Sequence, residues 1–181
     1  MITDIMRSYA KKQTKLFWCN MQDTLRKLAI LIRDLLTISE SFIKIGRHNF
    51  EDDNFGTSYI TVDNLAPATL IAYSEEFDGA TEDQTLSQLW NLPAIVTFWG
   101  DNAYTNLSNF TLLLKSQKAL ELQTTLGIAC FSSNNITDVK LLGGKQYNNR
   151  IELNLNINFN LSVTVDTLRI DTAQTDFIYN K

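Results

Sequence analysis

A strictly alternating stretch near residue 160 constrains the fold of this chain more than any other feature. From Arg150 to Asp171 it reads RIELNLNINFNLSVTVDTLRID, with an apolar residue at every odd position between Ile151 and Val165. The even positions between them are polar, and four of them are asparagines: Asn154, Asn156, Asn158 and Asn160. Because side chains alternate across a strand, the pattern predicts one β-strand over residues 150–165, with an apolar face and an uncharged polar face. Strands in globular domains are usually about 5 to 6 residues long, so this strand is unusually long.

The alternation changes phase directly after this strand. Leu168 and Ile170 stand at even positions, whereas the apolar residues of the strand stand at odd ones. A shift of one residue moves every following side chain to the other face. We therefore expect a bulge or tight turn near Asp166 and Thr167, followed by a further strand.

Two segments have the three- and four-residue spacing of amphipathic helices. The first runs from about Asp23 to Ile38 and has apolar residues at Leu25, Leu28, Ala29, Ile32, Leu35 and Leu36. The second starts after a capping Asp101 or Asn102 and ends near Gly127. Its predicted buried stripe is Ala103, Leu107, Phe110, Leu114 and Leu120.

Several shorter segments are rich in residues that favour strands. They are Ser41–Ile45, Ser58–Val62, Thr69–Tyr73, Ile128–Phe131 and, within Leu86–Trp99, a strand that starts at Pro93 and stops at Gly100. Residues 74–85 are acidic and turn-rich, and residues 132–149 have few apolar anchors, so both are predicted to be loops or hairpin tips. The order predicts one α+β domain over residues 22–181, with a mostly antiparallel β-sheet and two main helices packed on one face. An N-terminal extension with basic and aromatic residues, 1–21, precedes it.

The composition is that of an ordinary globular protein, with 44% hydrophobic and 20% charged residues in 181. No stretch has the roughly 18 to 20 uninterrupted apolar residues of a membrane helix, so no membrane partner is expected. The first 22 residues have basic residues without a following apolar region, which does not match a signal peptide. Cys19 and Cys130 share no CxxC spacing, and no disulfide framework is predicted.

Charge is unevenly distributed along the chain. Residues 1–50 have nine Lys or Arg and four Asp or Glu, a net of +5, whereas residues 51–181 have seven and sixteen, a net of −9. No Lys or Arg lies between Arg47 and Lys115. A basic end and an acidic body can pair head to tail with further copies or with a polarised partner, although a solvated basic helix beside an acidic surface would give the same pattern.

Residues capable of catalysis or metal binding do not form a convincing site in the sequence. His48 is the only histidine, and its nearest potential co-ligands are Glu51, Asp52 and Asp53 in a polar loop, where such residues are usually solvated. There is no G-x-S-x-G elbow to support a nucleophilic serine. The sequence therefore predicts no catalytic, metal or cofactor-binding residues, no small-molecule substrate, and a protein that works by contact.

Two other function classes stay open from the residues alone. Glu75 and Glu76 could serve a carboxylate-dependent hydrolase, which needs a pair of acids. The Lys, Arg and aromatic residues within 7–33 have the composition of a nucleic-acid contact, although the acidic body and a pI of about 5.0 oppose it.

The order of several landmarks resembles the tail terminator, or neck, proteins of tailed bacteriophages. An amphipathic helix precedes YITV (Tyr59–Val62), then VTFWGDNAY (Val96–Tyr104) runs into a helix and LGIACF (Leu126–Phe131). A Thr137-Asp138-Val139 turn with Leu141-Leu142, RIELNLNINF (Arg150–Phe159) and TLRID (Thr167–Asp171) follow. The resemblance covers about residues 22–171. The chain departs from the family pattern in its N-terminal extension and its acidic 74–85 segment.

The resemblance implies a virion structural protein of the tail or neck, assembled in the host cytoplasm. Proteins of this family form a homo-oligomeric ring, usually of six copies, on the last ring of the tail tube. The ring stops polymerisation of the tail tube protein and docks the head-side connector or stopper protein, with DNA only as passing cargo. Another connector, stopper or tail completion subunit is the alternative within structural proteins.

Two sets of residues are candidates for contacts in such an assembly. Oligomer or partner contacts are expected at Arg7, Lys11, Lys12, Lys15, Trp18, Glu75, Glu76, Asp78, Lys140, Lys145 and Arg150. An uncharged face suits a wall past which DNA slides, because it makes no fixed positive contact to phosphate. The channel-facing candidates are accordingly Asn154, Asn156, Asn158 and Asn160, although an ordinary solvated sheet face would give the same pattern.

Overall fold

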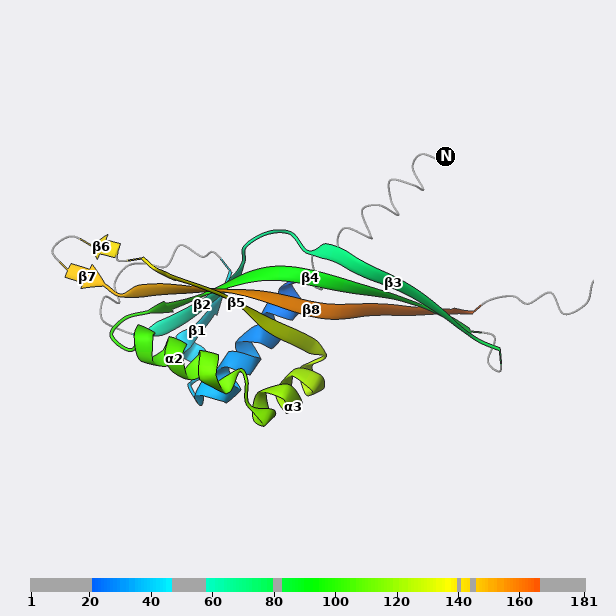
Figure 1. The fold of residues 1–181 in the computed structure, drawn as a ribbon, viewed down its shortest axis with the longest axis horizontal. Helices are drawn as coiled ribbons and strands as arrows, with labels where there is room; N and C mark the ends of the chain where they lie inside the picture. Colours follow the sequence, from blue (N-terminus) through cyan, green and yellow to red (C-terminus); the bar gives the residue numbers. More distant parts are fainter. Residues whose placement is uncertain (1–20, 47–57, 80–82, 140, 144–145, 167–181) are drawn as a thin grey trace, which may run out of the picture.

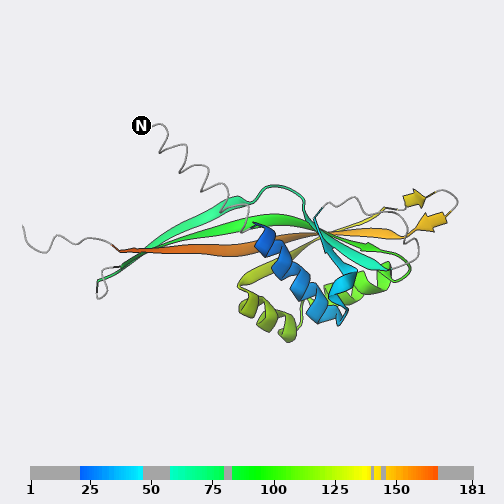
Figure 2. The ribbon, with the colours of Figure 1, turned by 180° about the vertical axis from the view of Figure 1, so that it is seen from behind.

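The computed structural model of the 181-residue chain describes residues 21–46, 58–79, 83–139, 141–143 and 146–166. These residues form one long, mostly antiparallel sheet with helices on one face, which confirms the predicted α+β class. In Figures 1 and 2 the helices gather on one face near one end of the sheet. The other end continues past them as a narrow β structure.

The main sheet has the strand order β1-β2-β4-β8-β5, with β3 paired to β4 off this path. Its strands are β1 (Ile43–Ile45), β2 (Tyr59–Asn64), β3 (Thr69–Asp78), β4 (Asp83–Trp99), β5 (Ile128–Asp138) and β8 (Arg150–Asp166). A separate hairpin joins β6 (Leu141–Gly143) to β7 (Gln146–Asn148). Only β1 and β2 pair in parallel; all other described pairs are antiparallel.

The predicted 150–165 strand is confirmed as β8, which pairs with all of β4 in an unbroken register from Arg150↔Trp99 to Asp166↔Asp83. Its odd residues from Ile151 to Phe159 are buried under the helices. Even residues of β4 share this face, because directly paired residues of antiparallel strands point the same way. Those in the core are Leu92, Ala94, Val96 and Phe98. The phase change after Val165 lies outside the described residues.

Three α-helices and a short 3₁₀ turn cover this apolar face. The first helix covers residues 21–36 of the described chain and buries most of its predicted stripe, including Leu25, Leu28 and Ile32. Leu31, which was not predicted, is also buried, whereas Leu36 is only half-buried. A 3₁₀ turn, η1 (Glu40–Phe42), leads into β1, so the strand predicted from Ser41 starts two residues later.

The prediction of a single helix between Asp101 and Gly127 is wrong, because the structure has two helices there. They are α2 (Ala103–Leu113) and α3 (Gln117–Leu126), and Ser116 caps α3 by accepting a hydrogen bond from the Ala119 N–H. The break shifts the helical phase, so that Ala119 is buried while Leu120 is 55% exposed. Gly127 ends α3 in the left-handed conformation, with φ of 65°, as predicted.

Pro93 lies inside β4, although proline removes a backbone donor and is normally confined to edges. The Pro93 carbonyl accepts a hydrogen bond from Leu65, in the segment that leaves β2. Since the N and O atoms of one strand residue point to the same side, the missing N–H also faces this gap between β2 and β3. The pairing of β4 with β2 ends at Ala94, and its pairing with β3 begins at Asn91. Pro93 lies between these two pairings, so its missing N–H removes no strand hydrogen bond.

Of the two segments predicted as loops or hairpin tips, 74–85 is confirmed as a hairpin end, although its strands extend further than predicted, and 132–149 is not a loop. Residues 74–78 continue β3 and residues 83–85 begin β4, and strand pairing joins them from Ser74↔Ser87 to Asp78↔Asp83. Residues 132–149 are not one loop, since β5 extends to Asp138 and the β6–β7 hairpin follows. In both segments, backbone pairing with a long neighbouring strand outweighs a weak local strand propensity.

Candidate functional site

The most distinctive surface is the part of the sheet that extends beyond the helices. It consists of β3, residues 83–90 of β4 and residues 160–166 of β8, and we call it the ribbon (Figure 1). Every residue of β3 is exposed to solvent. Seven strand residues span about 23 Å at about 3.3 Å each, so the ribbon reaches well beyond the body.

The ribbon continues the apolar face of the core without anything covering it among the described residues. Strand pairing places three rows on the helix side: Tyr73–Gln88–Leu161, Glu75–Leu86–Val163 and Phe77–Gln84–Val165. Phe77 is 53% exposed and Val163 is 57% exposed. Contiguous exposed apolar residues on a soluble protein generally mark a contact site.

One carboxylate lies within this apolar surface, and others lie on the opposite face of the same strand. Glu75 lies in its middle row and accepts hydrogen bonds from the Gln84 amide and, at 3.4 Å, from the Tyr73 hydroxyl. Burial, followed by the Glu75 charge, raises the pKa of Tyr73. Glu76 and Asp78 alternate to the opposite face and are also exposed. The surface therefore combines apolar contact area with negative charge.

The face of the sheet opposite the helices is the open face, and it bears the asparagines. Asn154, Asn156 and Asn158 are half-buried and Asn160 is exposed. The Asn91 amide donates to the Asn158 side-chain oxygen at 2.9 Å, so the row bonds laterally across strands. A channel would exist only in an assembly, so the expectation that these asparagines face one stays a prediction.

A stack of aromatic and basic side chains crosses one end of the open face. The Tyr59 and Trp99 rings stack with centroids 5.5 Å apart. Lys44 lies 5.3 Å from the Tyr59 centroid, and the Arg150 guanidinium lies 4.9 Å from the Trp99 centroid. Arg150 also pairs with Glu152. This arrangement links four strands and engages both cations within the protein.

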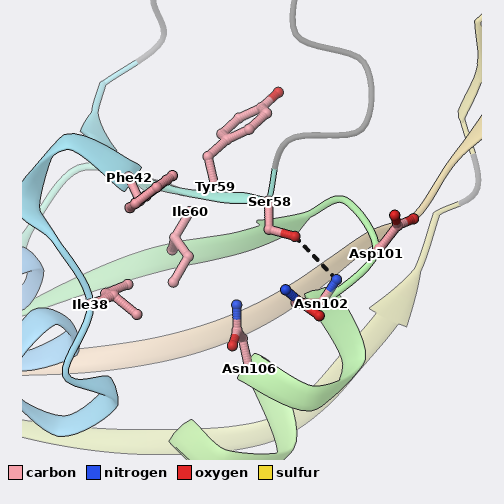
Figure 3. Close-up of a pocket in the computed structure, with 8 residues that line it drawn as sticks. All are labelled: Ile38, Phe42, Ser58, Tyr59, Ile60, Asp101, Asn102 and Asn106. Atoms are coloured by element: carbon pink, nitrogen blue, oxygen red, sulfur yellow. Dashed lines mark hydrogen bonds between the residues drawn. The ribbon is translucent and has the colours of Figure 1, made fainter.

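A pocket of about 500 Å³ lies where the start of α2 meets β2. Figure 3 shows its lining: Ile38, Phe42, Ser58, Tyr59, Ile60, Asp101, Asn102 and Asn106. The Ser58 hydroxyl oxygen accepts a hydrogen bond from the Asn102 N–H at 3.1 Å. Gly100 has φ of 85°, and a Cβ there would lie 2.9 Å from the Ser58 Cα, so this close approach requires glycine. The lining residues include one carboxyl group and no histidine, cysteine or lysine, so they do not form an acid–base pair.

Groups that could bind a metal or act as a nucleophile are scarce in the described ranges. These ranges contain no cluster of three His, Cys, Asp or Glu residues suited to a metal ion. Cys130 is buried, and burial raises the pKa of its thiol to about 12, which keeps it protonated and unreactive at neutral pH. His48 and its acidic neighbours lie outside the described residues. Within those residues, every helix is too short or too polar to span a lipid bilayer.

Comparison of the sequence with models of known protein families identifies the family of this chain. A family model described as phage neck terminator protein matches residues 24–181. The chain belongs to the phage neck terminator family. A search of curated proteins found no significant match. The resemblance inferred from the order of landmarks is thus confirmed, and the protein is a structural component of the phage neck.

The residues expected to make contacts in this neck terminator protein fall into three groups. Glu75, Glu76 and Asp78 lie together, exposed, on the ribbon. Arg150 lies far from them in the aromatic stack, already paired with Glu152. The remaining candidates, namely Arg7, Lys11, Lys12, Lys15, Trp18, Lys140 and Lys145, lie outside the described residues.

Sequence reasoning missed one buried polar contact that shapes the neck terminator protein. Gln123 is buried on α3, and its side-chain oxygen accepts a hydrogen bond from the Cys130 N–H at 2.7 Å. The bond ties α3 to the start of β5. Its sequence signal is the position of Gln123 four residues after Ala119 on the buried stripe of α3, where a polar residue needs a partner.

Proposed function

We propose that six copies of this protein form a closed ring that caps the tail tube, stops its polymerisation and docks the head-side connector. The proposal extends family membership to a specific assembly. The observation that carries it is the ribbon, an acidic and apolar surface that projects about 23 Å beyond the body.

A ring requires each subunit to present two different, complementary surfaces, because the same contact repeats around the axis. An elongated subunit with a projecting, acidic end meets this requirement better than a compact, evenly charged one. The absence of Lys and Arg between Arg47 and Lys115 makes the ribbon end uniformly negative. The rest of the subunit must then supply the basic and apolar counterpart.

Tube-assembly measurements test the proposal directly. Tail tube protein polymerised in vitro should give tubes of uncontrolled length, and addition of the neck terminator protein should cap one end and halt growth. Electron microscopy would show a ring of density on the capped end, and averaging would count its copies. Tubes that keep growing at the same rate, with no density at either end, would overturn the proposal.

A further inference from the structure

A narrow groove lies in the helical body, far from the ribbon tip (Figures 1 and 2). It runs between the first helix and the edge strand β1 and has a volume of about 230 Å³. Ala29, Ile30, Ile43 and Ile45 form its apolar part. Ligand pockets usually have about 300 to 1,000 Å³, so a groove of this size suits one or two protein side chains better than a small molecule.

Basic groups line the groove rim. Arg33 is already engaged by Asp34, at 2.7 Å, and by Glu40, at 3.8 Å. Arg26 also lines the groove, is exposed, and pairs with no carboxylate among the described residues. An apolar groove with an uncommitted arginine is complementary to an apolar tip with carboxylates.

We propose that the ribbon tip of one copy docks in this groove of the next copy, with Phe77 as the inserted side chain. Phe77 is half exposed at the tip and shares its row with Val165 across the three strands. Glu75 lies two residues away on the same face, where it can approach Arg26 of the next copy. The inference rests on the proposed ring and assigns the contact that closes it.

The strand register shows that Phe77 cannot fill the groove of its own chain. Lys44, in the middle of β1, pairs with Thr61 of β2, which in turn pairs with Thr97 of β4. Phe77 of β3 pairs with Gln84 of β4. Thr97 and Gln84 are thirteen residues apart, which is about 43 Å along a strand at about 3.3 Å per residue. Because the tip and the groove are two different, widely separated surfaces of one subunit, their pairing is a head-to-tail contact, which closes into a ring when the rotation between copies allows it.

A complementation experiment tests this contact with two full-length variants. Phe77→Asp disables the tip and leaves the groove intact, whereas Ile30→Glu disables the groove and leaves the tip intact. Each variant alone should lose assembly and have the mass of a monomer. A 1:1 mixture should give a heterodimer and nothing larger, because one functional tip meets one functional groove. Native mass spectrometry and light scattering measure these masses.

Controls separate loss of contact from loss of fold. Ser74→Asp places the same charge on the same strand but on the opposite face of the ribbon, and should assemble as the wild type does. If Phe77→Asp or Ile30→Glu unfolds at a much lower temperature than the wild type, Val165→Asp and Arg26→Glu replace them at the tip and groove. Tip variants that assemble normally, or folded variants that do not dimerise when mixed, would overturn the inference.

A second readout covers a protein that assembles only on tail tubes. Phe77→Cys with Ile30→Cys, in a chain with Cys19→Ser and Cys130→Ala, should give a covalent ladder on oxidation of capped tubes, whereas each single cysteine should not. No ladder on capped tubes overturns this contact but leaves the ring proposal standing.

Discussion

The two halves of β8 have the same alternating pattern but lie in different surroundings. From Ile151 to Phe159 the odd residues are buried beneath the helices, whereas Val163 and Val165 on the same face are exposed. The pairing with β4 continues without interruption through both halves. Alternation thus determines which side chains share a face, but it does not determine what covers that face. The helices cover it in the body, whereas Val163 and Val165 on the ribbon stay exposed.

The sharpest test of this difference is a pair of truncations on the same face of β8. Leu155→Ala leaves a cavity in the core and should lower the free energy of unfolding by about 2 to 5 kcal/mol. Val163→Ala removes exposed surface and should change it by about 0.5 kcal/mol or less. Urea unfolding of the isolated protein measures both values. Equal losses would show that the ribbon face is covered within the monomer.

A smaller difference in stability is expected between the loss of a buried hydrogen bond and the loss of an exposed one, each made to a side-chain oxygen. Gln123→Leu leaves the buried Cys130 N–H without its acceptor and should cost about 1 to 3 kcal/mol of stability. Glu75→Gln alters an exposed bond on the ribbon and should have an effect of about 0.5 kcal/mol or less. Thermal unfolding followed by circular dichroism reports both. Gln123→Met, of similar length and also without the acceptor, serves as a control for packing.

A third contrast should appear only at alkaline pH. Burial raises the pKa of Cys130 to about 12, whereas an unfolded cysteine has a pKa of about 8.5. As pH rises between these values, the unfolded chain releases a proton that the folded chain retains, so the free energy of unfolding falls by up to about 1.4 kcal/mol per pH unit. Below about pH 8 this contribution is constant.

The variant Cys130→Ala isolates the contribution of the buried thiol. Stability is measured by urea unfolding at pH 8 and pH 10 for both proteins, and the other titrating groups cancel in the difference. The wild type should lose more stability than the variant between the two pH values. Parallel losses would show that Cys130 does not titrate differently in the folded and unfolded chains.

The sequence predicted the body of the fold better than the ribbon, for a physical reason. Leu153, Leu155 and Ile157 lie where local alternation and burial agree, so the pattern alone located β8. On β3, Glu75 interrupts the apolar row between Tyr73 and Phe77, and the acidic run therefore looked like a loop. Pairing with β4 stabilises that strand, and a long-range pairing of this kind has no local signature.

The candidate contact site was predicted only in part. The acidic residues of the ribbon were expected to make contacts because they stand in one continuous segment. The groove combines Arg26 and Ile30 of a helix with Ile43 and Ile45 of a strand, and only the packing of helix against sheet edge brings them together. Spacing along the chain does not indicate such a combination.

The acidic outer edge of β3 has a consequence for how free subunits behave before assembly. Among the described residues β3 pairs only with β4, so its other edge presents unpaired backbone groups that could join the same edge of another subunit. Glu75, Glu76 and Asp78 would then meet their own copies, and like charges at an edge repel. This repulsion disfavours symmetric edge-to-edge dimers of free subunits.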